Sequence, residues 1–339
     1  MRKIFFWVML VLFNGNSVQA QSAKTSLYPA LEPFQSGQLP VSELHTIAWM
    51  ISGNDAGIPV ILLHGGPGGR SSPSMRRLFD PQRYRIIQFD QRGAGKSTPF
   101  AEWRENTTQL LVDDINKLRD HLNVKDKAVV FGISWGTTLA LAYAERYPEK
   151  VSGLILAGVF TGRRDEIRHL YHDGPMQFYP ENLEKLKQIL PEPDNDNYAK
   201  QLFELITGED RQIAERAIVT FGAYESWMES VGATYEASLK DAQEPKTKSL
   251  ATLENYYMMN ECFLKEDQLF AEINRIAYIP VSIINGRLDM LTPPATAYAL
   301  SKRLNNARLE IIEGAGHGDI GVALGVVRGS GWILEQIAK

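Results

Sequence analysis

Short, mostly apolar runs recur along this 339-residue chain, and stretches with apolar residues at helical spacing separate most of them. Such runs have the length and continuity of strands buried on both faces of a sheet. They span residues 59–63, 84–89, 127–131, 151–159, 279–285 and 308–312. Strands that alternate with helices predict an α/β fold, with a mostly parallel sheet and helices on both of its faces.

The alternation stops in the middle of the chain. Residues 162–275 contain helical patterns without a convincing buried strand, and they hold 22 Asp and Glu residues against 13 Lys and Arg. We expect this acidic segment to be a helical cap inserted into a core formed by residues 21–161 and 276–339. Residues 21–44, with three prolines, are expected to form an irregular arm.

The N-terminus has the pattern of a secretory signal peptide. Arg2 and Lys3 precede a short apolar run at 4–13, and small residues lead to a cut predicted after Ala20. The run is too short to span a bilayer, so residues 1–20 predict a periplasmic or secreted protein without stable membrane insertion after cleavage. The net charge of −4 does not favour a nucleic-acid partner.

Candidate chemistry begins with Gly-x-Ser-x-Gly at Gly132, Ser134 and Gly136. A strand-type run comes before it and an Ala/Leu-rich stretch of helix type follows. Strand, sharp turn and helix are the setting of a nucleophile elbow, in which the turn presents the serine hydroxyl above the sheet. The pattern therefore predicts Ser134 as a nucleophile.

Partners for this serine follow two later predicted strands. Asp289 comes just after the run at 279–285, and His317 comes just after the run at 308–312. The chain order Ser, Asp, His is that of α/β-hydrolases, and the carboxyl ends of parallel strands share one edge of the sheet. We expect His317 to accept the serine proton and Asp289 to orient the imidazole.

A glycine-dense loop, His64-Gly65-Gly66-Pro67-Gly68-Gly69, follows the strand at 59–63. It lacks the Lys-Ser/Thr of a phosphate-binding loop, so an oxyanion-hole loop is the better interpretation. The backbone N–H groups of Gly66 and Trp135 are the predicted oxyanion donors. Serine catalysis of this kind calls for no cofactor and no metal.

Three motifs in order, residues 64–69, 90–97 and 134–136, resemble those of prolyl aminopeptidases, also called proline iminopeptidases. The resemblance spans nearly the whole chain after residue 20. It implies an α/β-hydrolase serine peptidase that releases N-terminal proline from short peptides with a free N-terminus, through an acyl-enzyme on Ser134. The same fold and triad could instead serve a broader aminopeptidase, a tripeptidyl peptidase or an ester hydrolase, and a non-catalytic binding protein is a third possibility.

The resemblance also implies that two cap glutamates bind the free amine. Glu254 matches one family motif, whereas Met228 stands where the other motif has its glutamate. Glu229 or Glu225 could take that place; Glu229 is the closer in sequence. Phe160 and Tyr171 match family aromatics that line the proline pocket.

Overall fold

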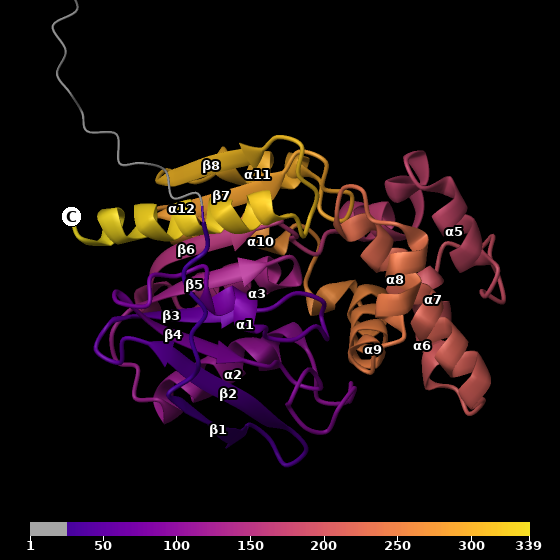
Figure 1. Ribbon diagram of the computed structural model, residues 1–339, viewed down its shortest axis with the longest axis horizontal. Helices are drawn as coiled ribbons and strands as arrows, with labels where there is room; N and C mark the ends of the chain where they lie inside the picture. The colour runs from indigo at the N-terminus through magenta and orange to yellow at the C-terminus, as the bar shows by residue number, and fades with distance from the viewer. Residues whose placement is uncertain (1–25) are drawn as a thin grey trace, which may run out of the picture.

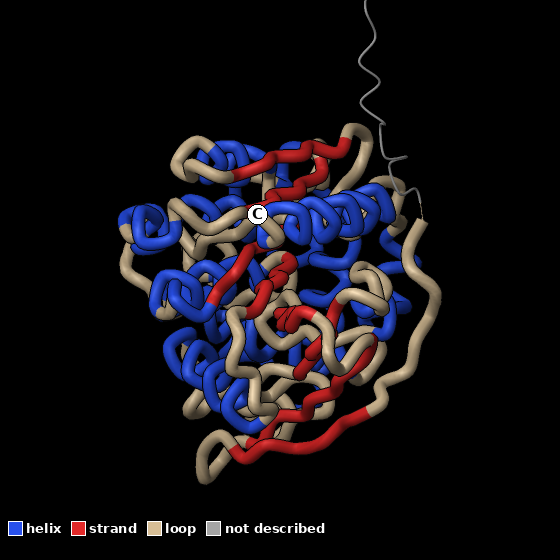
Figure 2. Tube along the Cα trace, turned by 90° about the vertical axis from the view of Figure 1, so that its left-hand side faces the viewer, coloured by secondary structure: helices blue, strands red, loops and turns tan. Residues whose placement is uncertain are grey.

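The computed structural model describes residues 26–339, so the predicted signal peptide lies outside the described residues. A single eight-stranded sheet forms the centre of the molecule (Figure 2). Its strands are β1 (Gln35–Pro40), β2 (Thr46–Gly53), β3 (Ile58–Leu63), β4 (Tyr84–Phe89), β5 (Ala128–Ile133), β6 (Val151–Ala157), β7 (Val281–Gly286) and β8 (Ala307–Ile312).

The strands lie in the order β1-β2-β4-β3-β5-β6-β7-β8. Only β2 runs against the others, because it pairs antiparallel with both β1 and β4, and each pairing from β4 to β8 is parallel. The predicted mostly parallel sheet is confirmed. The carboxyl ends of β3, β5, β6, β7 and β8 therefore meet at one edge.

Helices cover both faces of this sheet. They are α1 (Pro73–Arg76), α2 (Thr108–His121), α3 (Trp135–Arg146), α10 (Gln268–Ala271), α11 (Pro294–Ser301) and α12 (Ile320–Ile337), with the short η1 (Pro148–Lys150). Among residues 26–339, no helix combines the length and the apolar character needed to cross a membrane.

Alternating residues of the central strands supply two separate apolar cores. Ile61 and Val130 point into the core shared with α2, α3 and α11, whereas Val60 and Val129 point into the core shared with α12. Successive residues of a strand face opposite sides, so a strand buried on both faces must be apolar at every position. This explains the unbroken apolar runs of the sequence.

The cap lies between β6 and β7 and extends beyond one end of the sheet, at the right of Figure 1. Its elements are α4 (Arg164–Arg168), η2 (His169–Asp173), η3 (Pro175–Gln177), α5 (Pro180–Lys187), α6 (Tyr198–Thr207), α7 (Arg211–Glu229), α8 (Tyr235–Ala242), α9 (Lys246–Met259), η4 (Glu261–Phe263) and η5 (Ile273–Ile276). Cap residues such as Phe221 and Tyr257 join the α2–α3 core, so the two parts share one apolar cluster.

The expectation of an irregular arm over residues 21–44 is wrong for part of its length, because residues 35–40 form β1. This is the exposed edge strand of the sheet, where a proline at the end of a strand removes no needed hydrogen bond. Gly37 packs so closely on Trp49 of β2 that a Cβ there would lie 2.6 Å from the indole ring. Pairing with β2 thus determines the extended conformation of residues 35–40, which their polar sequence does not suggest.

Glu145 on α3 is a buried carboxyl group whose Oε1 has no hydrogen-bond partner among the described residues. Burial, with repulsion from Glu272, raises its pKa to about 9, although Arg275 opposes the rise. A raised carboxyl pKa means that folding takes up a proton at neutral pH, so stability is lost as pH rises from about 4.5 toward 9. Each unit of that rise costs about 1.4 kcal/mol.

We therefore expect Glu145→Gln to stabilise the protein by about 3 kcal/mol at pH 7 and by less than about 0.5 kcal/mol at pH 4.5. Denaturant unfolding at the two pH values measures this difference. Glu149→Gln, at an exposed position four residues further along, is the matched control. An equal effect of Glu145→Gln at both pH values would show that Glu145 is not held neutral by burial.

Candidate active site

Ser134 lies at a sharp turn between β5 and α3. Its backbone is strained, with φ of 56° and ψ of −128°, a conformation that non-glycine residues rarely adopt. The flanking glycines are required by contact: a Cβ on Gly132 would lie 2.1 Å from the Gly136 carbonyl oxygen, and one on Gly136 would lie 2.2 Å from that of Leu63. The close approach of strand, helix and β3 leaves the half-buried serine at the carboxyl edge of the sheet.

Asp289 and His317 meet beyond the ends of β7 and β8. The Asp289 Oδ2 atom lies 2.8 Å from His317 Nδ1, and both side chains are buried. The backbone N–H groups of Leu291 and Thr292 donate to Asp289 Oδ1 at 3.1 and 2.8 Å, which fixes the carboxylate. Donation from Nδ1 to Asp289 leaves Nε2 of His317 as the nitrogen available to accept a proton.

Both Ser134 and His317 border the same peptide segment at the end of β6. The Ser134 N–H donates to the Ala157 carbonyl oxygen at 2.9 Å, and a Cβ on Gly158 would lie 2.7 Å from His317 Cε1. The Ser134 hydroxyl itself has no hydrogen bond to His317 within the described chain. Such catalytic bonds are often long before substrate binds, so the three side chains remain suitably grouped for nucleophilic catalysis.

The loop after β3 lies against the elbow. A Cβ on Gly65 would lie 3.6 Å from Ser134 Oγ, and Gly66 has a φ of +111° that favours glycine. Within residues 26–339, the N–H groups of Gly66 and Trp135 donate to no other part of the chain. Trp135 is the first residue of α3, where free amides and the helix dipole favour negative charge.

Gln91, which the sequence did not single out, joins the loop to the elbow. Its side chain donates to the His64 carbonyl at 2.9 Å and accepts from Trp135 Nε1 at 2.9 Å. Its backbone N–H donates to His64 Nε2 at 3.0 Å, so His64 is a buried structural residue. Asp90, beside it, accepts from the N–H groups of Ser71 and Lys96 at 2.7 and 2.8 Å. The second motif of the sequence thus supports the oxyanion loop and contributes no reacting group.

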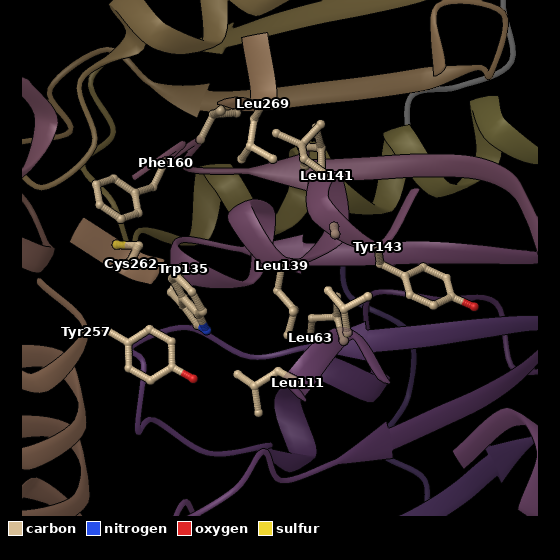
Figure 3. Close-up of a cluster of buried hydrophobic side chains, with 14 of the residues drawn as sticks. Leu63, Leu111, Trp135, Leu139, Leu141, Tyr143, Phe160, Tyr257, Cys262 and Leu269 are labelled. Carbon is tan, nitrogen blue, oxygen red and sulfur yellow. The ribbon is translucent and has the colours of Figure 1, made fainter. Parts of the chain in front are cut away.

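Helix α9 of the cap packs directly on this region. Ser249 donates to the Gly68 carbonyl at 2.8 Å, and a Cβ on Gly68 would lie 2.9 Å from Leu253 Cβ. The Tyr257 ring meets Trp135 edge to face at 4.9 Å between centroids, as Figure 3 shows. One face of α9 therefore covers the elbow and the glycine-rich loop at residues 64–69.

Glu254, the next residue along α9 from Leu253, is buried and forms a carboxyl pair with the half-buried Glu225 of α7. The two carboxyl groups lie close enough to influence each other's protonation, and the Oε2 atom of each is buried without a partner among the described residues. Burial first, and then repulsion from Glu225, raises the pKa of Glu254 well above its usual value. Burial and nearby Glu229 raise that of Glu225 to about 7. One proton shared between two carboxyl groups satisfies this arrangement.

Glu229, the other candidate partner of Glu254, lies elsewhere. It is the last residue of α7, it is exposed, and its Oε1 would lie 2.9 Å from a Cβ on Gly318. Its backbone carbonyl accepts from the Gly318 N–H at 2.8 Å. The structure therefore brings Glu225, one helical turn before Met228, against Glu254, and it brings Glu229 beside the loop of His317.

Phe160 and Tyr171, the aromatic residues predicted to line the proline pocket, are both buried. The Tyr171 hydroxyl donates to Asn255 Oδ1 at 3.0 Å, next to Glu254 in the sequence. Phe160 follows the end of β6 and lies near Cys262 in Figure 3. Burial, together with the Glu254 and Glu225 carboxyl groups, raises the pKa of Tyr171 well above 10 and keeps it neutral.

His317, the predicted base, lies in an acidic environment. Burial alone would lower the pKa of His317, but Asp289 and, more weakly, Glu229 and Glu225 raise it to about 9. Arg287, a possible competitor for Asp289, pairs with Glu313 at 2.8 Å instead. Asp289 is therefore free to serve His317.

Two more supporting residues escaped the sequence analysis. Thr292 Oγ1 lies 3.0 Å from Asp289 Oδ2 and 3.1 Å from His317 Nδ1, and Asn285 Nδ2 donates to Asp289 Oδ2 at 3.3 Å. The Asp-x-x-Thr spacing was the available signal for Thr292, because Asp side chains commonly bond backbone N–H groups two and three residues on.

Comparison with known proteins agrees with this geometry. Residues 58–323 match the family model described as alpha/beta hydrolase fold, which confirms the predicted fold class. The chain is 44% identical over 292 residues to a probable proline iminopeptidase of Leptolyngbya boryana, covering 86% of this chain and 91% of that one. It is 41% identical over 300 residues to a proline iminopeptidase of Arabidopsis thaliana, and the match covers 87% of this chain and 78% of that one.

Among solved structures, a bromoperoxidase from Bacillus anthracis is similar with a TM-score of 0.62 and 18% identity, covering 89% of this chain and 100% of that one. At that identity the likeness concerns the fold alone. The two sequence matches show family membership as well, since they cover most of both chains at 41–44% identity. The chain belongs to the proline iminopeptidase family of the α/β-hydrolase fold, as its motifs predicted.

Proposed function

We propose that this protein is a serine aminopeptidase that releases an N-terminal proline from short peptides with a free amino terminus. The relatives named proline iminopeptidase support this assignment. The Glu225–Glu254 pair is the observation that best supports it, because an aminopeptidase needs a receptor for the substrate ammonium. This pair of carboxyl groups, carried by cap helices α7 and α9 and near enough for Glu225 to act on His317, supplies one.

In this mechanism Ser134 attacks the prolyl carbonyl carbon while His317 Nε2 takes its proton. The carbonyl oxygen becomes an oxyanion, and the N–H groups of Gly66 and Trp135 stabilise it. His317 then protonates the leaving amine as the C–N bond breaks, which gives a prolyl ester on Ser134. Water, deprotonated by His317, hydrolyses the ester and frees Ser134. Asp289 keeps the imidazole oriented and stabilises its charged form.

Amine recognition follows from the carboxyl pair. The incoming ammonium displaces the shared proton and forms charge-assisted hydrogen bonds with Glu225 and Glu254. A blocked terminus cannot donate these bonds, so it would leave buried acidic groups unsatisfied. Phe160 and Tyr171 provide apolar surface for the proline ring nearby.

Hydrolysis of a panel of aminoacyl anilides tests the assignment. We expect kcat/KM for proline anilide to exceed the values for alanine and leucine anilides. Comparable rates on all three would indicate a broader aminopeptidase, and cleavage of aryl esters alone would indicate an ester hydrolase on the same triad.

The acidic surroundings of His317 predict an alkaline pH profile. A base must be neutral to act, and a pKa of about 9 leaves most of the imidazole protonated at pH 7. We expect kcat/KM for a neutral aryl ester, which has no titrating amine, to rise about tenfold per unit from pH 6 to 8 and to level near pH 9. A plateau reached below pH 7 would contradict the raised pKa.

We also propose export from the cytoplasm, on the pattern of residues 1–20. Expression of the full chain with sequencing of the mature N-terminus tests this proposal. A new N-terminus at Gln21 in the periplasm or medium is expected, and an uncleaved cytoplasmic chain would contradict it.

A further inference from the structure

Glu229 is an acidic side chain at the active site that the proposed mechanism does not use. Its carboxylate contacts Gly318, the residue after the catalytic base, and it is exposed. No lysine, arginine or hydrogen-bond donor pairs with this carboxylate in the described part of the chain. Glu229 thus places an unpaired negative charge at the rim of the site.

A second carboxylate reinforces this charge. Asp319 Oδ2 accepts from the N–H groups of Gly316 and Val231 at 2.6 and 3.2 Å, and it also lacks a cationic partner among residues 26–339. These bonds, with the bond from Gly318 to the Glu229 carbonyl, tie the end of α7 to the His317 loop. These bonds hold the backbone of Glu229 beside the His317 loop.

The chemistry of the reaction identifies what faces this rim. His317 Nε2 must lie within hydrogen-bond reach of the leaving amine nitrogen, since it delivers the proton to that atom. The residue that begins the leaving peptide is consequently held beside the His317 loop. Its side chain extends from the α-carbon next to that nitrogen, in the neighbourhood of Glu229.

We propose that Glu229 forms a subsite that selects a cationic residue, lysine or arginine, immediately after the released N-terminal residue. This inference rests on the proposed aminopeptidase function. An ammonium on a flexible four-carbon stem can reach an exposed carboxylate without disturbing the backbone of the leaving peptide. A glutamate at the same position would instead meet Glu229 and Asp319 as like charges.

Three dipeptide amides test the subsite: Pro-Lys, Pro-Gln and Pro-Glu, with release of proline measured at low salt. We expect kcat/KM for Pro-Lys to exceed that for Pro-Gln about fivefold, as for a favourable exposed ion pair, and Pro-Glu to be the slowest. In about 1 M salt the preference should shrink toward one, because exposed charges are screened.

Glu229→Gln keeps the backbone bond to Gly318 and should bring the Pro-Lys to Pro-Gln ratio to about one. Glu229→Lys should reverse the order in favour of Pro-Glu. Glu215→Gln, an exposed glutamate on the same helix, is the matched control and should keep the wild-type ratio.

Equal wild-type rates on the three amides would overturn the subsite while leaving proline release intact. A Glu229→Gln variant that loses the same factor on all three would do so as well, because it would indicate a structural role. Failure to release proline from any of them would overturn the proposed function itself, and the subsite with it.

Discussion

Replacement of Ser134 by alanine is expected to abolish hydrolysis, with a fall in kcat of about 10⁵–10⁶-fold. The reason is that the elbow presents the Ser134 hydroxyl beside Gly65, whereas the nearby Thr292 hydroxyl is bound to Asp289 on the Nδ1 side of His317. Alanine tolerates the position 134 backbone about as well as serine does, since both carry a Cβ at a φ of 56°. Turnover of proline anilide, with thermal unfolding measured in parallel, tests this expectation.

Unfolding of Ser134→Ala should match that of the parent protein, which would assign the loss to chemistry. Ser36→Ala, at an exposed serine of the edge strand β1, is the control and should keep full activity. Substantial turnover by Ser134→Ala would show that another group attacks the substrate and would remove the triad assignment.

The second prediction with a large expected effect concerns the Glu225–Glu254 carboxyl pair. Glu254→Gln should lower kcat/KM for proline anilide by about 10²–10³-fold, because the substrate ammonium would lose a buried charged partner. A neutral aryl ester, which never contacts the pair through an amine, should lose less than about tenfold. Glu225→Gln should show the same contrast, and the double variant should lose less than the product of the two, because the residues act as a unit.

Glu236→Gln, at an exposed glutamate of α8, is the matched control and should leave both substrates unaffected. Equal losses on the amine and the ester in Glu254→Gln would show that the pair supports the structure of the cap and does not recognise the amine. A large loss for Glu254→Gln without one for Glu225→Gln would restore Glu229 as the candidate partner.

Much of this site could be predicted from sequence because its signals are local. Ser134 and Asp289 each follow a buried strand, and His317 follows the partly buried edge strand β8. Apolar runs identify such strands without any knowledge of the rest of the fold. The carboxyl ends of parallel strands share an edge, so three separate loops could be placed together before any distance was known.

The cap pair could not be predicted in the same way, because it depends on packing between helices. Helix α7 runs through Gly222 to Glu229. That glycine weakens a helix locally, but it lets α7 approach α8 and α9: a Cβ there would lie 2.3 Å from Thr247 Cγ2 and 3.2 Å from Ala242 Cβ. The contact between Glu225 and Glu254, which are distant in sequence, exists only once these helices pack.

The most direct test of the central claim compares proline anilide with N-acetylproline anilide on the wild-type enzyme. We predict a kcat/KM ratio of at least about 10³, since acetylation removes the ammonium and leaves the Glu225–Glu254 pair unsatisfied. A ratio near one would contradict amine recognition by the cap and would leave a general hydrolase on the same triad.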